Sequence, residues 1–583
     1  MTKERIYRGI PVSPGISIAK AYVYSRRQIN VNPQSISPAE TEKEIHNLDS
    51  AIERSKYELN KVYTLSKEKI GEENSKIFDA QMQILNDKVF FEGIINKIRT
   101  EHKSAATLIH GESLKMEELL SKSREQYLQE RATDFTDVMH RILRNMKNER
   151  LVSKVDENSI IVAHVLTPAD TILFSKRKVI GYATDTGGTT SHAAIISRAL
   201  RVPAVVGMKN ISKSVIHGST IIIDGFDGLI ITNPSEETIS RFRNKLEDYL
   251  KHEKDLEKII YLPCETLDGK HINLTTNVEF DEEIEFVKYK DRCGIGLYRT
   301  EHLFFEKGEF PSLTEQIQEY TYISDVAFPE MVTIRTYDIG GDKLLDKKDK
   351  ENNPFLGWRG IRICLDRKEI FKEQLTAMLI SSIKKNVKIM FPMIASVDEV
   401  QNAKSLIEEC RQELDRKGIP YDSEIQVGIM IEVPSAVMIA DDLAKVSDFF
   451  SIGTNDLIQY ILAVDRGNSM ISKLFQEFHP AILRAIRDVV ISGHRNNIKV
   501  SVCGEMASIP KASFVLIGLG VDELSVVPSI YPQIKQIIRS VNFEEVRNFA
   551  NELLEESSEN TIKEKVNNYF ENRIMKIINK NGK

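Results

Sequence analysis

The chain has 583 residues, 41% of them hydrophobic and 28% charged, with 79 basic against 85 acidic side chains and a formal net charge of −6. This composition predicts a globular protein of several domains, and the absence of a basic excess argues against a general nucleic-acid binder. The amino terminus lacks the apolar core of a signal peptide, no stretch is apolar for long enough to span a bilayer, and the five cysteines are scattered. We expect a cytoplasmic protein with no membrane insertion, no nucleic-acid partner and no disulfide framework.

The composition and the hydrophobic periodicity of the sequence change twice within the first 232 residues. A short β-rich stretch is followed, over residues 25–147, by a segment almost without Gly and Pro in which apolar residues recur at helical spacing, as in Ile45, Leu48, Ile52 and Leu59. Short β-rich runs then alternate with helical signals, at residues 160–163, 179–183, 205–206 and 220–223. We predict an α/β domain built from residues 1–24 and 148–232, with the helical domain 25–147 inserted after its first strand.

A charged segment, residues 233–260, has the pattern of a single linking helix. Beyond it, strand and helix patterns alternate, and the apolar, β-branched runs fall at residues 272–277, 294–299, 332–338, 387–393, 426–432, 449–455, 499–503 and 523–527. Eight such units over about 300 residues predict a (β/α)8 TIM barrel, which we assign to residues 261–575. The fold class is therefore multidomain α/β.

The run Gly-Gly-Thr-Thr-Ser-His-Ala-Ala-Ile at residues 187–195 places His192 between small residues and a predicted helix. Small residues let backbone N–H groups approach an anion, and a helix N-terminus favours a phosphate beside it. An imidazole is also a competent nucleophile near neutral pH. His192 is therefore a candidate carrier of a phosphoryl group, although the string alone equally describes a histidine in a Gly-rich turn.

Polar side chains follow several of the predicted barrel strands, which is where barrel enzymes place their active sites. Glu432 and Asp456 end adjacent strands, and two carboxylates completed by substrate and water oxygens suit Mg²⁺. A ring of cationic groups matches the geometry of phosphate and carboxylate: Arg299, Arg335, Arg359, Arg466 and Lys343. Cys503 lies at the same rim, where it is either a proton donor or a buried structural thiol.

The chain resembles enzyme I of the bacterial phosphoenolpyruvate:sugar phosphotransferase system over nearly its whole length. The resemblance rests on strings shared along the chain: SPGI, IFDAQMQILND, LTPADT, GGTTSHAAI, LYRTE, RTYDIGGDK, NPFLGWRGIR, IMIEVPSA, SIGTNDLIQYILAVDRGN and CGEMAS. The barrel strings are also shared with pyruvate phosphate dikinase and phosphoenolpyruvate synthase. Those relatives carry a large ATP-binding domain before the histidine domain, and here only the helical segment and no GxxxxGK[ST] string is found.

The resemblance implies an activity and a set of roles. His192 takes the phosphoryl group of phosphoenolpyruvate and passes it to a histidine of the carrier HPr, releasing pyruvate, as the first step of sugar uptake. The substrate is bound by Arg299, Arg335, Arg359 and Arg466 with Asn455, and Mg²⁺ is held by Glu432 and Asp456. Cys503 protonates the enolate, and Thr171 hydrogen-bonds the active histidine. The helical domain docks HPr, and the barrel forms a homodimer.

Three positions depart from the family's usual residues: Thr189 in place of a long or basic residue, His302 in place of Phe, and Gly360 in place of Ala. None of these three positions has one of the implied roles.

Besides an ATP-dependent enzyme, two other functions are alternatives to enzyme I. A catalytically idle scaffold predicts loss of His192, Glu432, Asp456 or Cys503, and all four are present. The nitrogen-regulatory paralogue usually adds an N-terminal sensory domain, for which no room is left before Ile10.

Overall fold

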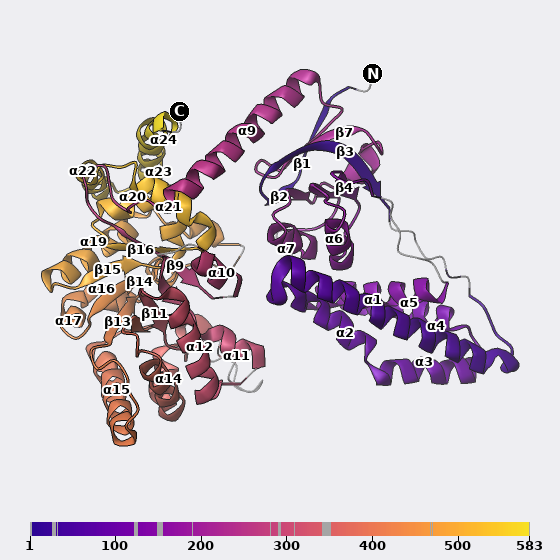
Figure 1. Ribbon diagram of the computed structural model, residues 1–583, viewed down its shortest axis with the longest axis horizontal. Helices are drawn as coiled ribbons and strands as arrows, with labels where there is room; N and C mark the ends of the chain where they lie inside the picture. The colour runs from indigo at the N-terminus through magenta and orange to yellow at the C-terminus, as the bar shows by residue number, and fades with distance from the viewer. Residues whose placement is uncertain are drawn as a thin grey trace. The chain divides into compact units, whose positions relative to one another are not determined.

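The computed structural model forms two compact units, Met1–Leu250 and Lys251–Lys583. Figure 1 shows both units, and each is described here by itself. The structure describes residues 3–25, 31, 33–121, 126–147, 155–188, 191–279, 281–289, 293–307, 309–340, 351, 353–466, 468 and 470–581. In these parts of the chain no helix combines the length and the apolar character that crossing a membrane requires.

The first unit contains a mixed sheet with strand order β1-β8-β7-β3-β4-β5-β6-β2. Its strands are β1 (Arg5–Arg8), β2 (Ile10–Ser13), β3 (Ile16–Tyr24), β4 (Ile160–Ala163), β5 (Gly181–Thr184), β6 (Ala204–Val206), β7 (Thr220–Asp224) and β8 (Leu229–Thr232). Strands β3 to β6 pair in parallel, and β3 ends more than a hundred residues before β4 begins. The predicted insertion after the first long strand is therefore confirmed, whereas β1, β2 and β8 were not predicted as separate strands.

The insertion is helical, as expected, and consists of α1 (Thr41–Ser75), α2 (Asp79–Leu85), α3 (Lys88–Glu101), α4 (Ala105–Ser121) and α5 (Gln126–Met146). The predicted apolar stripes form its core, in which Leu48 and Leu59 of α1 are fully buried against Val138 and Ile142 of α5. The same core includes residues of α6 (Pro168–Ser175) and α7 (His192–Ala199). The helical insertion thus packs directly on the helix that begins with His192.

The second unit is a closed barrel of eight parallel strands in sequence order. The strands are β9 (Asn273–Val278), β10 (Gly294–Tyr298), β11 (Val332–Arg335), β12 (Val387–Phe391), β13 (Gln426–Ile431), β14 (Phe449–Ile452), β15 (Lys499–Val502) and β16 (Glu523–Val526). Each predicted run overlaps one strand, so the barrel is confirmed. Most predicted runs end one to three residues beyond the strand.

Amphipathic helices cover the outside of the barrel (Figure 1). In α19 (Pro480–Arg495), for example, Ile482, Ile486 and Val489 are fully buried at helical spacing against the strands. The barrel interior is also apolar, with Leu297, Met390, Met430, Phe449 and Cys503 in one buried cluster. Because the barrel strands are packed on both faces, they read as continuous apolar runs.

The segment predicted as a linking helix forms α9 (Glu236–Ile259).

Candidate functional site

The predicted site residues of the second unit lie at the carboxyl ends of its strands. Arg299 follows β10 and Arg335 ends β11, while Glu432 follows β13 and Cys503 follows β15. Asp456 lies in the first turn of α18 (Thr454–Leu462), which begins two residues after β14. Because the strands are parallel and the barrel is closed, these ends meet at one face of the barrel.

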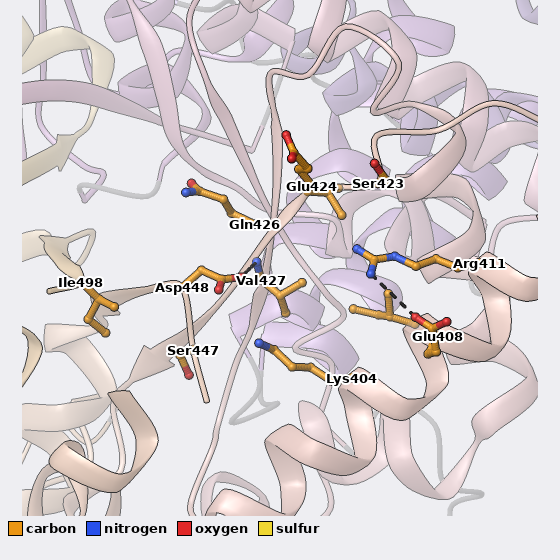
Figure 2. A pocket seen from close by; sticks show the side chains of 12 residues that line it. Lys404, Glu408, Arg411, Ser423, Glu424, Gln426, Val427, Ser447, Asp448 and Ile498 are labelled. Atoms are coloured by element: carbon orange, nitrogen blue, oxygen red, sulfur yellow. Dashed lines mark hydrogen bonds and ion pairs between the residues drawn. The ribbon is translucent and has the colours of Figure 1, made fainter. Parts of the chain in front are cut away.

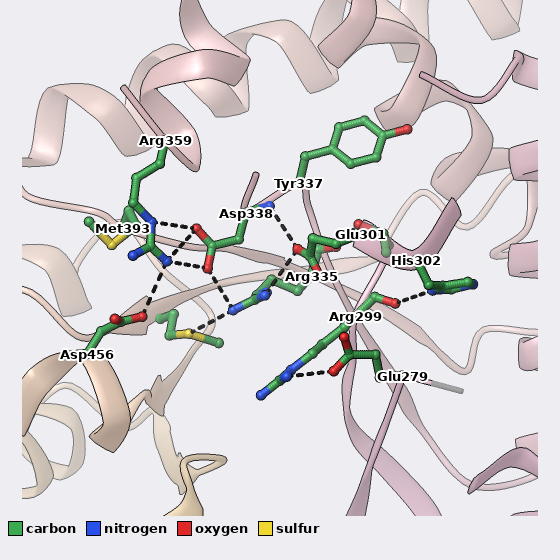
Figure 3. A network of polar contacts seen from close by, with 12 residues as sticks. Glu279, Arg299, Glu301, His302, Arg335, Tyr337, Asp338, Arg359, Met393 and Asp456 are labelled. Carbon is green, nitrogen blue, oxygen red and sulfur yellow. Dashed lines mark hydrogen bonds and ion pairs between the residues drawn. The ribbon is translucent and has the colours of Figure 1, made fainter. Parts of the chain in front are cut away.

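Asp338 lies at the centre of a buried network of ion pairs (Figure 3). Its carboxylate accepts hydrogen bonds from Arg359 Nε at 3.2 Å and Nη2 at 2.8 Å, and lies 3.1 Å from Arg335 Nη1. Glu301 Oε1 accepts a hydrogen bond from Arg335 Nη2 at 3.0 Å and another from the Asp338 backbone N–H at 2.8 Å. The two arginines and the two acids therefore hold one another in place.

The electrostatics of this network follow from its burial. Burial alone opposes the charge on Arg335, but the carboxylates of Glu301 and Asp338 outweigh it and raise the arginine's pKa. The pKa of Arg359 is likewise raised, because Asp338 and Asp456 outweigh the effect of burial. Both guanidinium groups therefore remain charged, with fixed orientations, at the mouth of the barrel.

Glu432 and Asp456 lie next to the same network. Glu432 is 1% exposed and its Oε1 accepts a hydrogen bond from the Met393 backbone N–H at 2.6 Å. Burial, followed by the charges of Asp456 and Asp338, raises the pKa of Glu432 to about 8. Asp456 Oδ2 lies 3.4 Å from Arg359 Nη2. Asp456 is therefore close enough to Glu432 to raise the pKa of that carboxyl.

Two further arginines of the predicted ring are also paired with acids. Arg299 Nη1 donates a hydrogen bond to Glu279 Oε2 at 2.6 Å (Figure 3), and Arg466 Nη1 donates one to Glu505 Oε1 at 3.1 Å. Asn455 donates to the same Glu505 oxygen at 2.9 Å. The predicted ring of cations is thus a ring of ion pairs. Lys343 lies outside the described residues.

Cys503 is 2% exposed and belongs to the apolar cluster inside the barrel. Its Sγ donates to the Ile452 carbonyl oxygen at 3.8 Å. Burial raises the pKa of the Cys503 thiol to about 11, so it stays protonated at neutral pH. A proton donor and a structural thiol both need that state, and the two interpretations of this residue stay open.

In the first unit, His192 is the first residue of α7. Ser191 caps this helix, its hydroxyl accepting a hydrogen bond from the Ala194 N–H at 3.4 Å. Thr171 lies in α6, which packs against α7, and its buried hydroxyl donates to the Thr167 carbonyl at 3.0 Å. The His192 side chain and Thr189 lie outside what the structure describes, so the predicted contact between Thr171 and His192 stays a prediction.

The remaining two departures have clear surroundings. His302 Nδ1 lies 3.1 Å from the Arg299 carbonyl oxygen, and its Nε2 lies 3.4 Å from the Tyr298 hydroxyl. Gly360 has a φ of +59°, and a Cβ there would lie 2.9 Å from Met393 Cγ. The left-handed backbone and the close approach both favour glycine next to Arg359.

Sequence reasoning assigned no role to the acids that pair with the arginines: Glu279, Glu301, Asp338 and Glu505. A signal was present for two of them. Glu301 follows Arg299 by two residues and Asp338 follows Arg335 by three, whereas Glu505 follows Cys503, at a strand end without an arginine. Acids this close to strand ends that carry arginines are candidates for counter-charges. Glu279 follows β9 and has no comparable pattern.

A cavity of about 640 Å³ lies at the opposite end of the barrel (Figure 2). It is lined by residues at or just before the amino ends of β13, β14 and β15, such as Gln426, Ser447 and Ile498, and by Lys404 and Arg411 of α15 (Val397–Lys417). This cavity is separate from the ion-pair network. Among the described residues, no group of three or more His, Cys, Asp or Glu side chains is arranged to hold a metal ion.

Comparison with known proteins gives three family matches along the chain: the PEP-utilising enzyme N-terminal domain over residues 8–131, the mobile domain over 155–228 and the PEP-binding domain over 253–543. The phosphoenolpyruvate-protein phosphotransferase of Staphylococcus carnosus is 38% identical over 97% of this chain and 99% of its own length. The phosphoenolpyruvate-protein phosphotransferase of Geobacillus stearothermophilus is 39% identical over 94% of this chain and 95% of its own length. A solved structure named Enzyme I (nEIt) is 35% identical and covers 42% of this chain and 99% of its own, with a TM-score of 0.37. The chain belongs to the phosphoenolpyruvate-protein phosphotransferase family, as the sequence motifs predict.

Proposed function

We propose that this chain transfers the phosphoryl group of phosphoenolpyruvate to His192 and then to a histidine of HPr, as the first step of sugar uptake. The observation that carries the proposal is the barrel mouth, where charged arginines and paired carboxylates converge at the strand ends. Guanidinium groups held in this way match the phosphate and carboxylate of the substrate. We assign substrate binding to Arg299, Arg335, Arg359 and Arg466, with Asn455 and Lys343.

The charges at the mouth fit a divalent cation. Among the described residues, four acids each pair with an arginine of the predicted site: Glu279, Glu301, Asp338 and Glu505. Asp456 lies 3.4 Å from Arg359, which Asp338 binds more closely, and Glu432 accepts a hydrogen bond from the Met393 backbone N–H. These two carboxylates are the least directly paired with arginine and are therefore the best placed to hold a cation. Two carboxylates with substrate and water oxygens suit Mg²⁺. When bound there, Mg²⁺ would supply charge neutralisation for the phosphoryl and carboxylate oxygens of the substrate.

The chain's own groups account for the covalent steps. The His192 imidazole attacks phosphorus as the P–O bond of phosphoenolpyruvate breaks, and the arginines stabilise the charge on the phosphoryl oxygens. His192 begins α7, and the N-terminus of a helix favours an anionic group beside it, which would stabilise a phosphoryl group on His192. The leaving enolate takes a proton on carbon from the Cys503 thiol, which yields pyruvate. Thr171 would support the histidine ring.

The parts of the chain then have separate roles. Residues 1–24 and 148–232 carry the phosphohistidine, residues 25–147 dock HPr, and residues 261–575 bind the substrate and form the homodimer. Because His192 and the barrel mouth lie in different units, the histidine must reach both the substrate and HPr. We assign residues 233–260, mostly α9, as the linker that permits this motion.

Incubation with labelled phosphoenolpyruvate, Mg²⁺ and purified HPr tests the proposal. Label should appear first on the chain and then on HPr, as an acid-labile, base-stable phosphohistidine. His192→Ala should remove all label from both proteins while phosphoenolpyruvate still binds to the barrel. Label that persists on the His192→Ala chain would refute the assignment.

A further inference from the structure

The Glu505 carboxylate is bound by two groups that we assign to the substrate. Its Oε1 accepts hydrogen bonds from Asn455 Nδ2 at 2.9 Å and from Arg466 Nη1 at 3.1 Å. The Glu505 carboxylate accepts one hydrogen bond from an amide and one from a guanidinium group, which are the donors that bind anionic ligands. Glu505 therefore makes contacts that a carboxylate or phosphate of the substrate would make with the same two side chains.

The backbone fixes this arrangement. The Glu505 N–H donates to Asn455 Oδ1 at 2.9 Å, which turns the amide NH₂ group toward the Glu505 side chain. The preceding Gly504 packs so closely on α18 that a Cβ there would lie 1.9 Å from Thr454 Oγ1. Only glycine permits that approach. The fold thus keeps the Glu505 backbone beside Asn455 whatever the rotamer of the Glu505 side chain.

The Glu505 side chain is far more exposed than those of the other acids that pair with arginines at the barrel mouth. The side chains of Glu301 and Asp338 are 6% and 4% exposed, that of Glu279 is 26% exposed, and that of Glu505 is 73% exposed. A buried acid cannot leave a buried arginine without leaving an unpaired charge. An exposed acid can rotate away from its partner and be solvated at small cost in free energy, because exposed ion pairs contribute little to stability. Glu505 is therefore the acid that most easily gives way to an incoming anion.

We propose that Glu505 is an internal competitor of the substrate: its carboxylate occupies the donors of Asn455 and Arg466, and phosphoenolpyruvate must displace it to bind. This inference rests on the proposed function, because it takes phosphoenolpyruvate as the ligand of the barrel mouth. It assigns to Glu505 the role of setting the affinity for substrate. The competing interpretation, in which Glu505 positions Arg466 and Asn455 for the substrate, predicts a change of the opposite sign.

The test measures binding of phosphoenolpyruvate to the full chain by titration calorimetry with Mg²⁺ at low ionic strength. All chains carry His192→Ala so that no phosphoryl transfer occurs. Glu505→Gln removes the charge and keeps the size and the backbone contact to Asn455. We expect it to tighten binding by about twofold to fivefold, the range that an exposed ion pair allows, and the gain should shrink as salt is added. In a chain that also carries Arg466→Ala, Glu505→Gln should lose most of this effect.

Glu424→Gln is the matched control, since Glu424 is an exposed acid at the cavity on the opposite end of the same barrel. It should leave the affinity unchanged. Weaker binding by Glu505→Gln would show that the residue positions the donors, and unchanged binding would show that the contact has no effect; either result overturns the inference. Failure of the chain with an intact Glu505 to bind phosphoenolpyruvate would instead overturn the proposed function itself.

Discussion

Asp338→Asn tests the buried network most directly. The substitution keeps the volume of the side chain and removes the charge that Arg335 and Arg359 share. Removing one partner of a buried ion pair costs about 3–5 kcal/mol. Arg335 keeps Glu301, and Arg359 keeps Asp456 and a hydrogen bond to the Tyr460 hydroxyl at 3.3 Å. We therefore expect the lower end of that range, about 3 kcal/mol less free energy of unfolding for the barrel.

Calorimetry of the full chain measures this effect as a fall in the Tm of the barrel, by about 4 °C for a unit of this size. The matched control is Asp441→Asn, whose partner Arg495 is 63% exposed while Asp441 itself is 42% exposed. An exposed pair of this kind contributes at most about 1 kcal/mol. Equal shifts in the two variants would refute the view that Asp338 compensates two buried guanidinium groups.

The same variant should lose activity in only one half-reaction. A displacement of the arginines by about 1 Å is expected to slow phosphorylation of the chain by phosphoenolpyruvate by about 10²-fold. Transfer from phospho-HPr back to His192 does not use the barrel and should proceed at the normal rate. An Asp338→Asn chain that is slow in both directions would point to misfolding, and one that is slow in neither would mean that Asp338 does not orient the arginines.

Three further predictions concern the two metal ligands, the pH dependence of stability and the proton donor. Glu432→Ala or Asp456→Ala leaves one carboxylate, so phosphorylation by phosphoenolpyruvate should stop while transfer from phospho-HPr continues, and equal loss of both would indicate a structural role. Because folding raises the pKa of Glu432 to about 8, the folded chain prefers the protonated acid; with Mg²⁺ chelated, the free energy of unfolding should fall as the pH rises from about 4.5 to 8, and Glu432→Gln should remove this fall. Cys503→Ser should slow phosphoryl transfer strongly and leave substrate binding unchanged, since a hydroxyl is a far weaker acid than a thiol, whereas near-normal turnover in Cys503→Ala would support the structural thiol.

Much of the architecture was predictable because it depends on local patterns. The eight apolar runs of the barrel, the helical stripes containing Leu48 and Leu59, and the charged helix α9 are each visible within a dozen residues. Strand ends were less predictable: the runs assigned to residues 332–338 and 449–455 end three residues beyond β11 and β14. The short strands β1 and β2 form by pairing with distant partners, for which the local sequence carries little signal. Strand β8 pairs with β1 and also with its neighbour in the chain, β7.

The sequence by itself determined the family, the order of the domains and the residue types at the strand ends. Only the tertiary structure decided how those residues pair. Arg335 lies 34 residues from Glu301, and Arg359 lies 97 residues from Asp456, so no spacing rule links them. Barrel closure brings the strand ends together, and ion pairing then depends on distances of about 3 Å between side-chain atoms, which are set by the packing of the whole barrel. For that reason a ring of arginines predicted from sequence is, in the folded chain, a set of ion pairs that differ in burial.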